Sequence, residues 1–223
     1  MCGRYTLLAD ELAIKEAFGL QQSLDFYGPS YNIAPGQKVL SIIHDGKNRR
    51  AGYMKWGLVP SWAQDPKIGY KMINARSETA HEKPSFKRLL SSKRCLIIAD
   101  SFYEWKKEMD KKQPMRIRLE GQEVFAFAGL WDKWQGDEEP LFTCTILTKP
   151  ANQDMENVHH RMPVILPKDR EEEWIEPAGN HAVDWKKWLD EVEQDKLIHY
   201  PVSTHVNNAK NNDEKCISPI VQM

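Results

Sequence analysis

A succession of short, strand-like apolar runs constrains the fold of this chain more than any other feature. Apolar or alternating runs of this length, bounded by polar turns, are typical of β-strands. Strands are predicted at residues 38–43, 52–59, 95–99, 102–107, 115–119, 124–128, 141–147 and 198–202. A turn at Asp45-Gly46 joins the first two strands, and loops are expected at 108–114 and 132–140.

Helical patterns are few and short. The first runs from Asp10 to Phe18, with Asp10 as its N-cap and Gly19 at its end. Further helices are predicted at 85–90, 154–158, 169–175 and 184–192. Because strands and helices do not alternate in a βαβ rhythm, we expect an α+β fold with a mainly antiparallel sheet or partly closed barrel and flanking helices. We expect a single domain over residues 1–223, with a loose polar tail from about residue 206.

The net charge of −1 conceals a strongly basic middle segment. Residues 1–46 hold 3 Lys/Arg and 5 Asp/Glu, residues 47–94 hold 12 and 3, and residues 95–223 hold 16 and 24. A local excess of this kind can form a groove for phosphate groups on a neutral protein. An ordinary solvated basic surface would give the same counts.

The four cysteines show no CxxC pair and no Cys/His spacing of a zinc site, so we expect no metal site and no cofactor. Cys95 and Cys144 lie in apolar runs and are predicted to be inert core residues, whereas Cys216 lies in a polar tail. No apolar run reaches the roughly 18 to 20 residues that span a bilayer. The first twenty residues lack the apolar region of a signal peptide, so a cytoplasmic location is expected.

Cys2 directly follows Met1, and a small second residue normally permits removal of the initiator methionine. Removal would leave an amine and a thiol on adjacent carbons. The amine, with an ordinary pKa of about 7.7–8.0, is partly neutral at cytosolic pH. It can attack an aldehyde to form a Schiff base, and the thiol can then close a thiazolidine ring. Position alone does not distinguish this role from an incidental cysteine.

Six segments together resemble one protein family. They are MCGR at residues 1–4, PSYNIAP at 29–35, WGLVPSW at 56–62, NARSET at 74–79, FYEW at 102–105 and HHRMP at 159–163. In this order they resemble the SOS response-associated peptidase (SRAP) domain family, from residue 1 to about residue 190.

The resemblance implies a protein of the DNA damage response that detects abasic sites in single-stranded DNA and links to them covalently through Cys2. In a bacterium it would join the nucleoid on damage. It implies that Asn74 holds the cysteine and the sugar, and that Glu104 and His159 transfer protons. His160 follows His159, and the spacing to Arg-Met-Pro selects His159.

The resemblance also implies a DNA-facing set of residues. These are Arg4, Arg76 and Arg161 for phosphates, with Trp56, Pro60 and Trp62 beside the strand. Arg offers bidentate phosphate contacts, and aromatic rings offer stacking faces for unpaired bases. Lyase activity, and an autopeptidase activity that exposes the cysteine, are further implications of the family.

Each site residue also has an ordinary structural interpretation. Asn74 could cap a helix that begins near Arg76, and Glu104 could point outward from a strand. His159 could be a hydrogen-bonded loop residue. Trp56 and Trp62 could pack in the core.

Two other functions stay open at the level of sequence. The first is a thiol peptidase or amidase that uses Cys2 with His159 and Glu104. The second is a non-covalent single-strand binding module. A peptidase would turn over peptides, whereas a covalent trap would form a stoichiometric DNA adduct.

Overall fold

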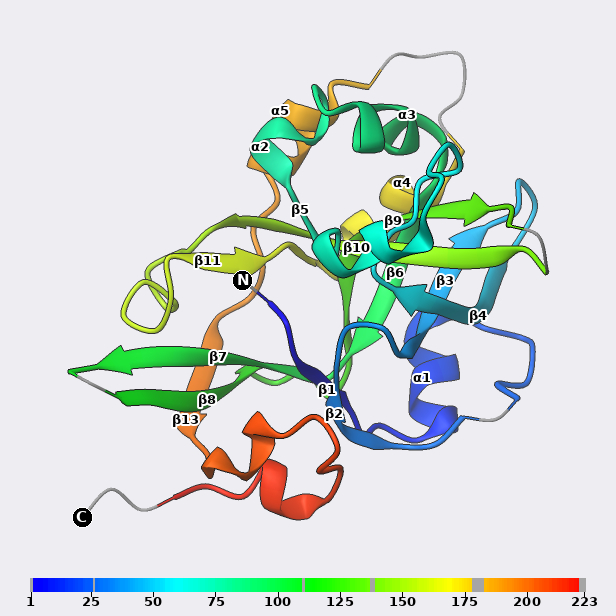
Figure 1. Cartoon of the computed structure of the whole chain (residues 1–223). Coiled ribbons are helices and arrows are strands. Elements are labelled where there is room, and N and C mark those ends of the chain that lie inside the picture. The colour runs from blue at the N-terminus through cyan, green and yellow to red at the C-terminus, as the bar shows by residue number, and fades with distance from the viewer. Residues whose placement is uncertain (1, 26, 110, 137–138, 178–182, 221–223) are drawn as a thin grey trace.

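The computed structural model describes residues 2–25, 27–109, 111–136, 139–177 and 183–220, and its strands form two sheets (Figure 1). The smaller sheet has the strand order β13-β8-β7-β1-β2, and all of its pairings are antiparallel. Its strands are β1 (Tyr5–Leu7), β2 (Ser30–Ile33), β7 (Ser101–Glu108), β8 (Lys111–Leu119) and β13 (Leu197–Pro201).

Five strands of the larger sheet close into a barrel. They are β3 (Lys38–His44), β4 (Arg49–Trp56), β6 (Arg94–Ala99), β9 (Phe125–Trp134) and β10 (Leu141–Pro150). β10 pairs in parallel with β4, and antiparallel pairings lead from β4 through β3, β6 and β9 back to β10. The pairings confirm the predicted α+β fold and show a closed barrel among mainly antiparallel strands.

Three short strands extend the larger sheet beyond the barrel. β5 (Asn74–Arg76) lies parallel to β10, β11 (Arg161–Pro163) lies antiparallel to β10, and β12 (Ile165–Leu166) pairs with β9. Sequence patterns did not predict these strands, because two or three residues are too few to show a period. They matter for function because β5 and β11 carry the NAR and RMP segments.

The strand β6 is buried at all six positions, which explains its continuous apolar run. Helix α4 (Glu171–Ile175) packs against it, and the Trp174 indole N–H donates to the Cys95 carbonyl oxygen at 3.0 Å. Cys95 and Cys144 are fully buried, as predicted.

The helices lie outside the barrel (Figure 1). They are α1 (Glu11–Phe18), α2 (Ser77–Ala80), α3 (Pro84–Ser92), α4, α5 (Trp185–Asp190) and the 3-10 helices η1 (Pro66–Lys71), η2 (Lys168–Arg170), η3 (Thr204–Asn207) and η4 (Glu214–Cys216). The predicted capping of α1 is confirmed, since Asp10 accepts from the Ala13 amide and Gly19 has a φ of 63°. Within the described part of the chain, no helix has the length and apolarity to span a membrane.

Two local predictions were wrong. Residues 154–158 form successive turns and no helix. The Asn152 carbonyl oxygen accepts from the Met155 and Glu156 amides, and the Met155 carbonyl oxygen accepts from the Val158 and His159 amides, so two separate turns follow each other. The predicted loop at 108–114 is also too long. β7 continues to Glu108 and β8 begins at Lys111, and these two residues lie opposite each other in the pairing.

Residues 206–216 are packed against the smaller sheet, which corrects the expectation of a loose tail for this part of the chain. The buried Asn32 side chain on β2 donates to the carbonyl oxygens of Val206, Asn208 and Asn211. Cys216 is fully buried. Composition suggested looseness, but backbone carbonyls of this segment satisfy a buried side chain and so hold it in place.

A close approach between two glycines positions the segment that follows β4. Gly57 has a φ of 125°, and a Cβ there would lie 2.7 Å from the Gly69 carbonyl oxygen in η1. A Cβ on Gly69 would lie equally close to the Gly57 oxygen. The two backbones therefore touch directly, and this contact sets η1 beside the end of β4.

Gly57→Ala is expected to lower the free energy of unfolding by about 2–4 kcal/mol, because backbone strain and steric overlap add. Urea denaturation measures this change. Gly52→Ala on β4 is the matched control, since a Cβ there meets no atom within 4 Å. Its effect should stay within about 0.5 kcal/mol. Equal effects of the two substitutions would contradict the proposed contact.

Candidate active site

Cys2 is fully buried beside the strand that carries Glu104. β1 pairs with β7, and the Tyr103 amide donates to the Arg4 carbonyl oxygen at 2.9 Å, which leads the start of the chain along β7. In Figure 1 the blue N-terminal segment runs between β7 and β11. Burial, followed by the negative charge of Glu104, raises the pKa of the Cys2 thiol. The thiol is therefore protonated at neutral pH.

Glu104 is only 3% exposed, so it is not the outward-facing strand residue of the alternative interpretation. Burial raises the pKa of its carboxyl, and the charge of His160 and the Trp105 amide act in the opposite direction. A carboxyl with a raised pKa can hold and release a proton closer to neutral pH than an ordinary glutamate.

The two histidines lie side by side where the turns end and β11 begins. Their ring centroids are 4.3 Å apart, and the His159 Nδ1 atom accepts from the Arg161 amide at 3.0 Å. Burial lowers the pKa of His159, whereas the charge of His159 is the main cause of the lowered pKa of His160. The Glu104 carboxylate acts on His160 in the raising direction. The role of His159 stays a prediction, and His160 is a second candidate beside the same carboxyl.

Asn74 opens β5 and has a buried acceptor atom available. Its Nδ2 atom donates to the Ile73 carbonyl oxygen at 3.0 Å, whereas its buried Oδ1 atom has no hydrogen-bond partner among the described residues. Helix α2 begins at Ser77 without a side-chain cap, so Asn74 is not the helix cap of the alternative interpretation. An unsatisfied buried acceptor costs about 1–3 kcal/mol, which a bound donor would recover.

The three predicted phosphate-binding arginines lie in different surroundings. Arg161 is buried and ion-paired with Glu78, and it also donates to the Thr148 carbonyl oxygen at 2.8 Å. Arg4 is half-buried and donates to Asn32 at 2.8 Å. Arg76 is exposed at the end of β5. Of the three, Arg76 has the guanidinium most open to a phosphate.

The basic segment 47–94 does not form one uniform surface. Five of its cations have internal partners: Arg49 with Glu172, Arg50 with Asp45, Arg88 and Lys93 with Asp132, and Arg94 with main-chain carbonyl oxygens. Arg50 and Arg88 of this paired group are exposed, and six further cations are exposed too: Lys47, Lys67, Lys71, Arg76, Lys83 and Lys87. The charge that can face a ligand is therefore smaller than the sequence count suggests.

The WGLVPSW segment is divided between core and surface. Trp56 is 1% exposed and donates from its indole N–H to the Ile73 carbonyl oxygen at 2.8 Å, so it supports the residue before Asn74 and offers no stacking face. Pro60 is also buried. Trp62 is 59% exposed and lines a surface pocket with η1 residues. Trp56 therefore packs in the core, which the sequence had left open as the alternative to a position beside DNA.

Sequence reasoning missed Tyr70, which is 69% exposed on η1. The Lys55 ammonium lies over its ring at 5.9 Å from the centroid. The 3-10 helix has no amphipathic period that would have revealed this residue. Trp62, Tyr70 and the lysines Lys55, Lys67 and Lys71 are defined here as the aromatic–basic face.

Sequence comparisons relate this chain to one protein family and to proteins named for abasic site processing. The family model for SOS response associated peptidase (SRAP) matches residues 1–209. Abasic site processing protein YoqW of Bacillus subtilis is 51% identical over 221 residues, which cover 97% of this chain and 99% of the relative. Abasic site processing protein YedK of Escherichia coli is 35% identical over 231 residues, which cover 99% and 100%.

A solved structure supports the fold. A protein from Bacteroides thetaiotaomicron matches with a TM-score of 0.87 at 23% identity, over 99% of this chain and 100% of that one. The family match spans every segment on which the sequence resemblance rests. This chain therefore belongs to the SOS response-associated peptidase (SRAP) family.

Proposed function

We propose that this chain senses abasic sites in single-stranded DNA and becomes covalently joined to them through Cys2 once Met1 has been removed. The burial of Cys2 beside the Glu104 carboxyl carries the proposal. The relatives are named abasic site processing proteins, which supports the choice of lesion. Cross-linking would shield the lesion during the DNA damage response.

The proposed chemistry is a condensation. An open abasic deoxyribose presents an aldehyde at C1′, to which the α-amine of Cys2 adds. Loss of the resulting hydroxyl as water needs a proton donor, and Glu104 suits this step because its pKa is raised. The nitrogen then gives up a proton and restores the carboxyl. The sulfur adds to the imine carbon while its proton passes to the nitrogen, leaving a thiazolidine and one water.

The protonation state of Cys2 favours this function over a thiol peptidase. A peptidase attacks with a thiolate, which requires a lowered thiol pKa. Burial, and then Glu104, raise the pKa of Cys2 instead. Ring closure begins from a neutral thiol and returns its proton within the same adduct. Autopeptidase and lyase activities stay predictions from the family.

The DNA strand is proposed to pass from the aromatic–basic face to the site at Cys2. Trp62 and Tyr70 offer exposed stacking faces, and Arg76 offers a cation at the end of β5. The open Oδ1 acceptor of Asn74 lies at the other end of that strand, where a sugar hydroxyl could donate to it. Base stacking tolerates any sequence, which suits a lesion sensor.

Mature protein should form a denaturation-resistant adduct with single-stranded DNA that contains an abasic site, at about one protein per site. Cys2→Ser keeps the amine and should form only an imine that is lost on denaturation without a reducing agent. Denaturing gels and intact mass measure both outcomes. Undamaged DNA of the same sequence is the control. An equally stable Cys2→Ser adduct would exclude ring closure.

Trapping should also scale with the fraction of molecules that lack Met1, as read by intact mass. With Met1 in place, the nitrogen of Cys2 is a peptide nitrogen and cannot condense with an aldehyde. Full activity of a sample that retains Met1 would rule out the mechanism.

Glu104→Gln should slow single-turnover cross-linking by about 10²- to 10⁴-fold while affinity for undamaged single strands is kept. A general acid acts while protonated, so the wild-type rate should fall as pH rises through the raised pKa of Glu104. That descending limb should vanish in Glu104→Gln. Asn74→Ala should lower the rate without reshaping the profile between about pH 6 and 8. Parallel losses of affinity with unchanged profiles would contradict the assignment.

Trp62→Ala and Tyr70→Ala should each weaken binding of undamaged single strands by about 1–3 kcal/mol, because each removes a stacking face. Arg76→Ala should reduce the salt slope of affinity by roughly 0.7. Fluorescence anisotropy at several salt concentrations measures both. Phe142→Ala is the matched control, since this ring is also exposed but lies on β10 beside Trp131. If Phe142→Ala weakens binding as much, the aromatic–basic face is not the DNA path.

A further inference from the structure

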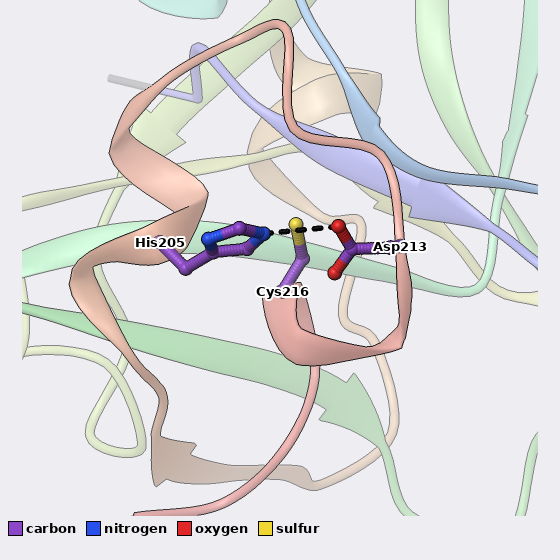
Figure 2. A group of neighbouring side chains, drawn as sticks. All are labelled: His205, Asp213 and Cys216. Atoms are coloured by element: carbon purple, nitrogen blue, oxygen red, sulfur yellow. Dashed lines mark hydrogen bonds and ion pairs between the residues drawn. The ribbon is translucent and has the colours of Figure 1, made fainter.

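Three side chains with different metal-ligating atoms converge in the segment that packs on the smaller sheet (Figure 2). One nitrogen of His205, one carboxylate oxygen of Asp213 and the sulfur of Cys216 all lie within 4.8 Å of one another. His205 belongs to η3 and Cys216 to η4, and Asp213 is the N-cap of η4. These residues lie outside the six segments that carry the family resemblance.

The positions of the three side chains are fixed by local hydrogen bonds. The Asp213 Oδ1 atom accepts from the Lys215 amide at 3.0 Å, and its Oδ2 atom lies 3.0 Å from His205 Nε2. The Asn211 side-chain amide donates to the His205 carbonyl oxygen at 2.8 Å and contacts the ring at 3.1 Å. The Cys216 sulfur lies 3.5 Å from the Asn211 carbonyl oxygen. One short segment therefore holds all three groups facing the same point.

We propose that His205, Asp213 and Cys216 form a binding site for a zinc-like divalent cation. Imidazole, carboxylate and thiolate are all ligands of Zn²⁺, and the sulfur disfavours Mg²⁺ and Ca²⁺. Zinc bonds of about 2.0–2.3 Å place tetrahedral ligand atoms roughly 3.3–3.6 Å apart, so side-chain movements of about 1 Å would close the site. On binding, the Cys216 thiol releases its proton to solvent, and a water completes four ligands.

The burial of the three groups suits an ion that enters from solvent. Cys216 is fully buried, whereas the Asp213 and His205 side chains are 53% and 29% exposed. The soft ligand thus lies at the inner end and the harder ligands at the outer end. Two anionic ligands would neutralise the charge of a divalent cation.

A cation here would stabilise the segment that supports β7 and the chain start. The Val206 carbonyl oxygen, next to His205, accepts from Arg4 at 2.7 Å. The Cys216 carbonyl oxygen accepts from the Tyr103 hydroxyl at 3.4 Å. Tyr103 directly precedes Glu104 in the chain, so a bound ion would stabilise the segment that contacts the neighbours of Cys2 and Glu104. The proposal does not depend on the proposed DNA chemistry.

Titration of metal-free, full-length protein with Co²⁺ tests the proposal, because Co²⁺ substitutes for Zn²⁺ and absorbs light. We expect one Co²⁺ per chain, a thiolate-to-cobalt charge-transfer band, and a raised Tm with Zn²⁺. Cys216→Ser should abolish the band. His205→Ala and Asp213→Asn should each weaken binding by about 10- to 100-fold or more.

His199→Ala is the matched control, because His199 is an exposed histidine on β13. It should bind Co²⁺ like the wild type. A band that persists in Cys216→Ser would assign the metal to another thiol and overturn the proposal. Absence of saturable binding would also overturn it, and would leave the His205–Asp213 contact as an ion pair only. Asp213→Asn alters an exposed side chain, so it keeps the test valid if Cys216→Ser fails to fold.

Discussion

Strands β1 and β7 are far apart in the sequence, yet they pair so that Tyr5 lies opposite Phe102. This pairing carries Cys2 out of solvent and sets it beside Glu104. Burial then raises the pKa of both groups, because the protein interior disfavours their charged forms. A neutral thiol next to a carboxyl with a raised pKa suits a condensation, in which a proton is given and taken back without a lasting charge.

Strand β10 organises the other half of the site. Its Thr148 lies opposite Arg76 on β5 and Pro163 on β11, so the NAR and RMP segments flank one strand. The ion pair between Arg161 on β11 and Glu78 on α2 stabilises this arrangement. Arg161 is buried whereas the Glu78 side chain is 37% exposed, so loss of Glu78 would leave a buried guanidinium without its carboxylate partner.

The sequence was informative wherever a signal is local. The cap at Asp10, the end of α1 at Gly19 and the apolar run of β6 follow from neighbouring residues, and the family segments follow from their order. Sequence left Trp56 open between the core and the DNA side, and it could not show the burial of Arg161, which depends on partners distant in sequence. The same holds for the residues between 205 and 216, whose polar composition suggested a loose tail.

The most direct test of the account is NMR of the adduct made with DNA that carries ¹³C at C1′ of the abasic sugar. With ¹⁵N in Cys2, the account predicts one tetrahedral C1′ carbon that is bonded to nitrogen and shows the one-bond coupling, with sulfur as its other new neighbour. An imine carbon, or a C1′ carbon bonded to a nitrogen other than that of Cys2, would contradict it.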